Sequence, residues 1–266
     1  DMDALTDLAK SRGLALIEDC AQAHGARWRG RHVGSIGDIG SFSFQASKNV
    51  TSGEGGIVTT NDQAIADLAW SYHNCGRTRG GRWYGHSRLG WNLRMTEFEA
   101  AILLGQLERF EEQAARRDEN GRYLDAQLSQ IPGVKVMAAD PRVTSNAYHL
   151  YIFRIEPEEF DGVTRDRFVA ALRAEGIPCS SGYVPLYKEP VFADPQGDTG
   201  QFLKAIGRRP DFYADVDLPD TVKACDLGVW IPQAVLLGDR SDMDSIVAAV
   251  SKVRENAREL VEAKVS

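Results

Sequence analysis

The pattern of apolar and polar residues predicts alternating strands and helices in the first part of the chain. Leu14–Ile17 has the pattern of a short buried strand, and Ile39–Phe44 and Gly56–Thr60 predict two more strands. Helical patterns that accompany these strands cover residues 2–13 and 62–72. This order of elements is typical of an α/β domain.

A long helical pattern follows. Thr96 and Glu99 have the spacing of a capping box, in which each side chain satisfies a free backbone amide at the start of a helix. Apolar residues then recur every three to four positions until Pro132 and Gly133, so we expect one uninterrupted helix. An uninterrupted amphipathic helix is also what a core helix looks like, so we assign it no chemistry.

After Val134, short strand and helix patterns mix, which predicts an α+β domain. Its expected elements are strands at Val134–Met137, Tyr148–Ile155, Ile177–Cys179 and Val229–Ile231, helices at 164–175, 219–227 and 241–261, and a variable loop at Glu189–Val216. The change of pattern therefore predicts a division into a first domain, residues 1–115, and a small C-terminal α+β domain, residues 116–266.

Two groups with complementary chemistry follow strands in the first part of the chain. Asp19 comes just after the first predicted strand, and Lys48 comes shortly after the second. Ligands bind at the carboxyl ends of the strands in an open α/β sheet, so both residues are candidates for one site. A lysine amine bonds to the aldehyde of pyridoxal phosphate (PLP), and a carboxylate on the pyridine nitrogen lets the ring accept electrons. Taken singly, a surface lysine and a helix-capping aspartate are the simpler explanations.

The sequence around these two residues resembles one family of PLP enzymes. The resemblance is carried by the motifs Asp19-Cys20-Ala21-Gln22-Ala23-His24-Gly25-Ala26, Gly34-Ser35-Ile36-Gly37-Asp38, Ser41-Phe42-Ser43-Phe44, Ser47-Lys48-Asn49 and Gly53-Glu54-Gly55-Gly56. These motifs resemble the sugar and cyclitol aminotransferases of the DegT/DnrJ/StrS group. The resemblance implies the aspartate aminotransferase fold, which is fold type I of the PLP enzymes, with residues 1–115 as the C-terminal part of the PLP-binding domain.

The resemblance also implies roles for single residues. Lys48 is the catalytic lysine that bonds to PLP, and Asp19 binds the ring nitrogen. Gln22 lies near the ring hydroxyl, and Ser43 binds the cofactor phosphate. Some members of the group carry histidine in place of the lysine and act as dehydratases, so Lys48 favours transamination.

The segment from His73 to Arg94 is dense in arginine, glycine and aromatic residues. It resembles a family loop that reaches the cofactor phosphate of the partner subunit, which implies a homodimer with shared active sites. Asn92 is the first candidate for this contact and Arg94 the second. Tyr183 and His24 are candidates for substrate contact, with simple packing as an equal alternative for Tyr183.

Composition and charge restrict the alternatives. The chain has 266 residues and 43% hydrophobic content, enough for one large domain or two smaller ones. A formal net charge of -7 argues against nucleic acid or an anionic membrane surface as a partner. The four cysteines have no metal-site spacing, which favours reduced thiols in a cytoplasmic enzyme and no metal. No apolar run approaches the roughly 18 to 20 residues of a membrane span.

The resembled family has an N-terminal segment that supplies a phosphate-binding loop and an aromatic residue that stacks on the ring. Neither feature is found before residue 14, so we expect the sequence to be the C-terminal portion of a longer enzyme.

The sequence predicts a PLP-dependent aminotransferase that moves an amino group from glutamine or glutamate to a keto-cyclitol or a nucleotide keto-sugar. Gly76-Arg77, Trp83-Tyr84 and the stretch Thr96–Arg109 most resemble the glutamine:scyllo-inosose aminotransferases. Two alternatives remain. One is another reaction on the same fold, such as dehydration or aromatisation, and the other is a non-catalytic or truncated relative.

Overall fold

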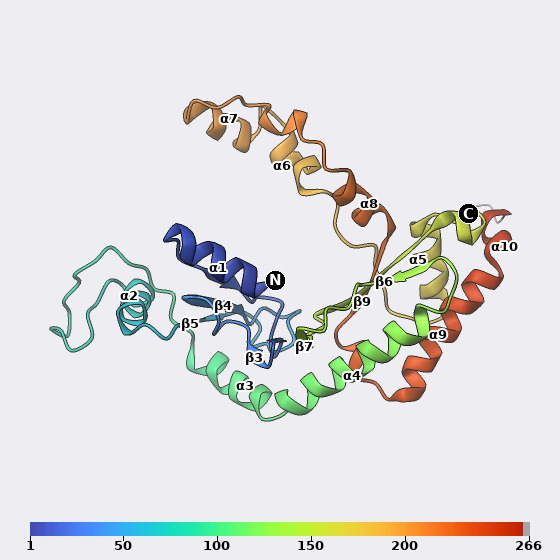
Figure 1. Ribbon diagram of the computed structural model, residues 1–266. Helices are drawn as coiled ribbons and strands as arrows, with labels where there is room; N and C mark the ends of the chain where they lie inside the picture. The colour runs from blue at the N-terminus through green and yellow to red at the C-terminus, as the bar shows by residue number, and fades with distance from the viewer. Residues whose placement is uncertain (263–266) are drawn as a thin grey trace. The chain divides into compact units, whose positions relative to one another are not determined.

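The computed structural model describes residues 1–262, which form two compact units (Figure 1). The first unit contains Asp1–Gly121 and Ala138–His149, and the second contains Arg122–Met137 and the chain from Leu150 onward. The expected boundary between residues 115 and 116 lies inside helix α4 (Phe110–Leu128), whose residues are divided between the units. The return of residues 138–149 to the first unit was not expected.

The elements of each unit follow in chain order. In addition to the first part of α4, the first unit contains α1 (Met2–Arg12), β1 (Ile17–Asp19), β2 (Arg27–Trp28), β3 (Arg31–His32), β4 (Ile39–Ser43), β5 (Gly56–Thr59), α2 (Gln63–His73), α3 (Glu97–Leu107) and β7 (Val143–Ser145). In addition to the end of α4, the second unit contains β6 (Val134–Val136), β8 (Leu150–Ile155), α5 (Arg165–Ala174), α6 (Pro190–Ala193), α7 (Asp198–Ala205), α8 (Pro219–Leu227), β9 (Gly228–Pro232), α9 (Arg240–Glu255) and α10 (Ala257–Glu262).

The central sheet of the first unit has the strand order β1-β4-β5. Strand β1 runs parallel to β4 with Asp19 opposite Ser41, and β5 runs antiparallel to β4 with Gly56 opposite Ser43. A second sheet, β3-β2-β7, joins the turn after β1 to residues 143–145, and the apolar pattern had not predicted it. Strands of two or three residues are too short to have a recognisable period.

The burial of β1 is the reverse of what its sequence predicted. Leu14 and Ile17 are both exposed, whereas the carboxylate of Glu18 is buried. Glu18 accepts hydrogen bonds from the backbone N–H groups of residues 34, 36 and 37, at 2.7 to 2.8 Å. These three bonds satisfy the buried carboxylate, so the strand places Glu18 on the packed side and Ile17 on the other.

Helix ends agree with their sequence signals, but helix lengths do not. Asp62 caps α2 by accepting from two backbone amides, and Thr96 with Glu99 forms the expected capping box at α3. The expected single helix is wrong, because the chain breaks at residues 108–109 between α3 and α4. There the Arg109 N–H bonds to the Gln106 carbonyl in a tighter turn than an α-helix makes.

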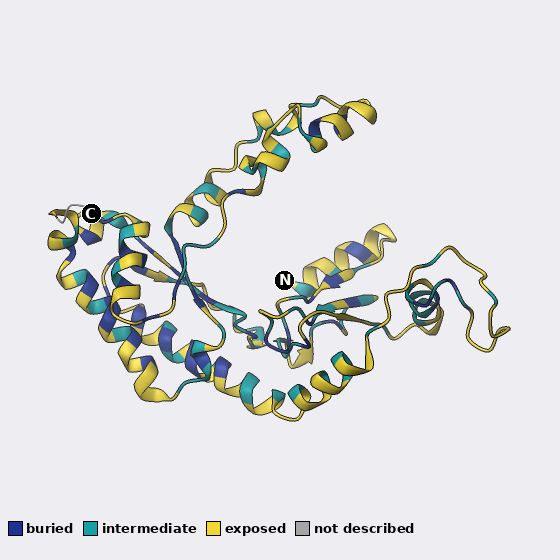
Figure 2. Cartoon of the chain, turned by 180° about the vertical axis from the view of Figure 1, so that it is seen from behind, coloured by how far each residue is buried: buried dark blue, intermediate teal, exposed yellow. Residues whose placement is uncertain are grey.

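The second unit has an apolar core on one face of the sheet β6-β8-β9. Alternate residues of β8, namely Tyr151, Phe153 and Ile155, are buried, and Val229 and Ile231 of β9 lie opposite the first two. Helices α5 and α9 contribute further buried side chains, which are Phe168, Leu172, Met243, Ile246 and Val250. Figure 2 shows buried stretches in dark blue on the strands and helices of this unit, whereas α3 has no buried residue.

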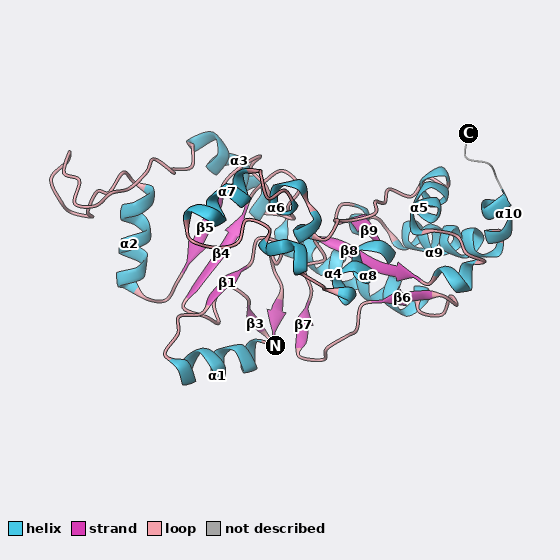
Figure 3. Ribbon diagram, turned by 90° about the horizontal axis from the view of Figure 1, so that it is seen from above, coloured by secondary structure: helices cyan, strands magenta, loops and turns pink. Residues whose placement is uncertain are grey.

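Two expectations for the second unit are wrong. Ile177–Cys179 is not a strand, because only Ser180 forms a single bridge, to Trp230. The expected loop at Glu189–Val216 contains the short helices α6 and α7 (Figure 3). The segment between Leu186 and Val216, here called the arm, has contacts of its own. Pro190 lies in the first turn of α6, and the ring of Phe192 contacts the ring of Tyr213 at a centroid distance of 5.4 Å.

Candidate active site

Asp19 and Ser43 lie at the carboxyl ends of two neighbouring strands. Asp19 is opposite Ser41 in a parallel pair, so their side chains share one face of the sheet, and Ser43 is two residues further along the same face. One oxygen of Asp19 accepts from the Ala21 N–H at 3.1 Å, and Ser43 Oγ accepts from the Gln45 N–H at 3.3 Å. The carboxylate of Asp19 and the hydroxyl of Ser43 therefore lie on the same side of the sheet.

Lys48 follows β4 in a loop that is fixed by its own hydrogen bonds. The Lys48 N–H donates to the Gln45 carbonyl at 2.9 Å, and Gln45 Oε1 accepts from both the N–H and the hydroxyl of Ser47. Thr51 donates to the carbonyl of Phe44 at 2.9 Å, which ties the far side of the loop back to the strand. Lys48 itself is half-buried, so its amine remains within reach of a ligand.

Four nitrogen-bearing side chains near the Lys48 loop are withdrawn from solvent. His24, Asn49 and Arg117 of α4 are buried, Arg117 with only 2% of its surface exposed, and His149 is half-buried. Burial lowers the pKa of Arg117 to about 10, and it lowers the pKa of His149, where the charge of Lys48 acts in the same direction. The charge of Lys48 acts on both His24 and His149, so polar groups that are 125 residues apart in sequence (149 − 24) lie near the lysine.

Sequence reasoning had assigned neither Asn49 nor Arg117 a role. Arg117 occupies a position between Ala114 and Leu124 on the apolar side of the helical pattern, and a charged residue there was the signal that could have found it.

Comparison with known proteins now adds the family. The profile of the DegT/DnrJ/EryC1/StrS aminotransferase family matches residues 1–251. The chain belongs to this family. One curated member, L-glutamine:2-deoxy-scyllo-inosose aminotransferase of Streptoalloteichus tenebrarius, is 37% identical over 270 residues, which cover 98% of this chain and 63% of that protein. The chain therefore spans less than two thirds of the length of this relative.

Solved structures of the DegT/DnrJ/EryC1/StrS family have the same fold. The crystal structure of 3-amino-5-hydroxybenzoic acid (AHBA) synthase matches with a TM-score of 0.77 at 32% identity, covering 95% of this chain and 64% of that one. The aminotransferase from Psychrobacter cryohalolentis matches with a TM-score of 0.81 at 28% identity, covering 97% and 66%. The predicted α/β architecture of fold type I is confirmed.

The residues at the strand ends fit the cofactor of this PLP-dependent family. A carboxylate for a protonated ring nitrogen, a hydroxyl for a phosphate oxygen and an amine for an aldehyde are all present, in Asp19, Ser43 and Lys48. Gly56, opposite Ser43, has no room for a side chain, because a Cβ there would lie 2.8 Å from the Phe42 carbonyl oxygen. Ser43, one of the three residues predicted to bind PLP, therefore lies where β4 and β5 approach each other closely.

The structure places the two remaining candidates near Lys48 differently. Gln22 is exposed on the turn after β1, whereas His24 is buried between the rings of Phe42 and Phe44, at centroid distances of 5.5 and 5.9 Å. Burial lowers the pKa of His24 to about 4, and Lys48, His149 and Arg117 add to this, while the nearby Ser43 backbone opposes it. Both ring nitrogens lack a partner with hydrogen-bond geometry among the described residues. The predicted roles of Gln22 and His24 stay predictions.

The loop that carries Asn92 and Arg94 folds back on itself. Asn74 and Asn92 form a backbone bridge, and Arg94 Nη1 donates to Asn74 Oδ1 at 2.8 Å and contacts the Cys75 sulfur at 3.5 Å. Arg94 is therefore partly engaged within its own loop, whereas the Asn92 side chain is exposed. Their predicted contact with a partner's cofactor stays a prediction.

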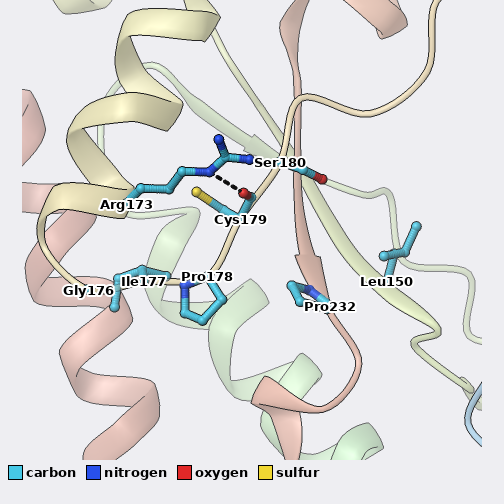
Figure 4. Close-up of a pocket in the computed structure, with 8 residues that line it drawn as sticks. All are labelled: Leu150, Arg173, Gly176, Ile177, Pro178, Cys179, Ser180 and Pro232. Carbon is cyan, nitrogen blue, oxygen red and sulfur yellow. Dashed lines mark hydrogen bonds between the residues drawn. The ribbon is translucent and has the colours of Figure 1, made fainter. Parts of the chain in front are cut away.

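Tyr183 belongs to the second unit, where its exposed ring packs edge-on against Trp230 at 4.6 Å. Close to this turn is a hollow of about 480 Å³, lined by residues of β8, α5 and the segment 176–180 (Figure 4). Arg173 closes one side by donating to the Cys179 carbonyl at 2.8 Å. The predicted substrate contact of Tyr183 stays a prediction.

Other features of the described residues bear on the expected chemistry. The four cysteines form no disulfide, and burial raises the pKa of the Cys20 thiol to about 11. Within residues 1–262, no helix is long and apolar enough to cross a membrane, and no three His, Cys, Asp or Glu side chains are grouped to hold a metal.

Proposed function

We propose that the protein that contains this chain is a PLP-dependent aminotransferase. The observation that carries the proposal is the placement of Asp19 and Ser43 on one face at adjacent strand ends, with Lys48 in the loop that follows, in a member of an aminotransferase family. The activity is proposed for the whole protein, because this chain spans only 63% of the length of its aminotransferase relative.

Each residue has a role that follows from its chemistry. When bound, PLP supplies an electron-accepting ring next to the amino carbon of the substrate. Asp19 holds the proton on the ring nitrogen, and Ser43 donates its hydroxyl to a phosphate oxygen. Lys48 would hold the cofactor through its amine, and this amine would move a proton at the amino-bearing carbon of the donor. Gln22 would orient the ring through the ring hydroxyl.

The substrates are proposed from relatives. The relative from Streptoalloteichus tenebrarius is named for L-glutamine as donor and 2-deoxy-scyllo-inosose, a keto-cyclitol, as acceptor. We assign the same classes to this protein, namely glutamine or glutamate as donor and a keto-cyclitol or nucleotide keto-sugar as acceptor. A homodimer, with Asn92 and then Arg94 reaching the partner's cofactor phosphate, and a cytoplasmic location belong to the same proposal.

A second candidate reaction is favoured by one specific likeness. The name of AHBA synthase, whose structure matches at 32% identity, says that it makes an aromatic amine. The two reactions are distinguished by their products, because an aminated cyclitol has no aromatic absorbance and an aminobenzoate has a strong ultraviolet band.

The test begins with the absorbance of the purified protein after addition of PLP, before and after borohydride. Wild type should give a visible band that borohydride abolishes by fixing the cofactor to the protein, and Lys48→Ala should give none. Lys10→Ala, which removes an exposed lysine of α1, is the matched control and should behave as wild type. Incubation with glutamine and a keto-cyclitol then identifies the product. Absence of the band in wild type would refute the assignment.

A further inference from the structure

The backbone around Lys48 is held from two sides. On the N-terminal side, Gln45 accepts from the Lys48 N–H and from Ser47. On the C-terminal side, Val50 is 2% exposed and anchors the loop in the first unit. The residue between Lys48 and this anchor is Asn49, and its side chain is directed to another segment of the chain.

Asn49 connects the Lys48 loop to a segment 98 residues away in sequence. Its Nδ2 donates to the carbonyl of Ala147 at 2.6 Å, and Asn49 and Ala147 are both 5% exposed. A buried amide donor that lost this acceptor would keep its full desolvation penalty, so the contact is a firm constraint on the loop.

The segment Asn146–His149, here called the strap, is itself held in a strained conformation. Tyr148 has a φ of 43°, a region that side chains other than glycine rarely adopt. The Asn146 N–H donates to Asp118 of α4, and the Tyr148 N–H donates to Asn146 Oδ1 at 3.1 Å. The Tyr148 ring lies over Gly121 of α4, where an added Cβ would be 2.6 Å from it. These contacts fix the strap against α4.

The last residue of the strap returns to the lysine. His149 is half-buried, and the charge of Lys48 acts on it. Among the described residues, His149 Nδ1 and Asn49 Oδ1 are buried without a hydrogen-bond partner. Buried polar groups that are left unsatisfied in this way reduce stability, and they concentrate where function requires them.

We propose that Asn49 is a positioning residue for Lys48, and that it acts by fastening the Lys48 loop to the strap Asn146–His149. The inference rests on the proposed PLP chemistry, because it assigns Asn49 the task of holding the lysine backbone while the amine reacts. It assigns no contact between Asn49 and substrate. Its effect is therefore on the orientation of the group that Lys48 holds.

The test compares Asn49→Ala with Thr59→Val in the PLP-loaded protein. Thr59 Oγ1 donates to the Gly34 carbonyl, also at 2.6 Å, so the control removes a hydrogen bond of the same length in the same unit, away from Lys48. The first readout is the visible circular dichroism of the bound cofactor divided by its absorbance, which reports how firmly the site orients it. The second is kcat and KM for the amino donor.

Asn49→Ala should lower the normalised circular dichroism and reduce kcat by about tenfold with little change in KM, since small misplacements of reacting groups have effects of this order. Thr59→Val should lower the melting temperature and change neither readout. If Asn49→Ala retains both at wild-type level, the proposal is wrong and the bond only stabilises the fold.

Asn146→Ala guards against failure of Asn49→Ala to fold. It removes the exposed acceptor of the Tyr148 N–H and loosens the strap from the other end. It should change both readouts in the same direction by a smaller factor, and wild-type values would overturn the proposal. A wild-type protein without a visible band would instead refute the proposed function, which separates the two failures.

Discussion

The two units are stabilised by different kinds of contact. The second unit buries aromatic and branched side chains from one face of a three-stranded sheet and from helices α5 and α9. In the first unit, β1 buries the carboxylate of Glu18. The buried groups near Lys48 include the polar side chains of His24, Asn49 and Arg117. The difference indicates that the second unit gains stability from apolar packing, while the first unit uses directional polar contacts to place its chemistry.

The largest effect is expected in the core of the second unit. Phe153→Ala removes a ring that is 1% exposed and packs edge-on against Phe168 at 6.1 Å, so it should cost about 3–5 kcal/mol. Urea unfolding, with hydrogen exchange of β8 to locate the change, measures it. Ile152→Ala, on the opposite face of β8, is the control and should cost far less. Equal losses would contradict a one-sided core.

The next effect tests the polar character of the first unit. Glu18→Ala leaves three backbone N–H groups without their acceptor, and we expect a loss of about 3 kcal/mol in the free energy of unfolding. Glu54→Ala, an exposed change in the Lys48 loop region, should be close to neutral. A Glu18 variant as stable as wild type would show that polar contacts do not organise this unit.

A pH dependence should sharpen the comparison further. His24 has a folded pKa of about 4 against an ordinary value of 6.5, so it is neutral when folded and binds a proton when unfolded between these values. Stability should therefore fall as the pH drops from about 6.5 to 4, by about 2 kcal/mol. His24→Phe should lack this loss, and His32→Phe, an exposed change on β3, should retain it. Unfolding curves of the wild type and both variants at pH 7 and pH 4.5 test this prediction.

The smallest effect could break the comparison, because it lies in a polar contact of the second unit. Arg165 Nη1 donates to the carbonyls of Cys225 at 2.7 Å and Gly228 at 3.2 Å, and it also contacts the Ser181 carbonyl. Arg165→Lys should cost about 1 kcal/mol, since a lysine cannot reproduce the planar donor group. Arg173→Lys, which alters one exposed donor, is the control. A loss that matched Phe153→Ala would remove the distinction between the units.

Much of the fold could be predicted where local signals act alone. The capping box at Thr96 and the strands β4 and β5 follow from short patterns, and they agree with the structure. The break at residues 108–109 has no proline to reveal it, and Leu107 and Phe110 on either side keep the helical spacing. The burial of Glu18 could not be predicted, because three amides from the turn at residues 34–37 satisfy it, and such partners are not visible in a periodic pattern.

The same distinction between local signals and long-range contacts applies to the candidate site. Asp19, Ser43 and Lys48 follow from strand ends and motifs, and the structure puts the first two on one face. The strap could not be predicted, because it depends on a bond between Asn49 and Ala147 and on a left-handed backbone at Tyr148. No residue type in the sequence indicates either feature. Glycine is the usual residue at such a φ, but position 148 is a tyrosine.

The arm between Leu186 and Val216 offers a route to protein engineering. Its helices α6 and α7 contact each other and the turns on either side, and Phe192 and Phe212 both pack on Tyr213. Because these contacts are local, the arm is a natural cassette for exchange between relatives. Chimaeras that swap it, while keeping Trp230 of β9, would leave the apolar core of the second unit unchanged.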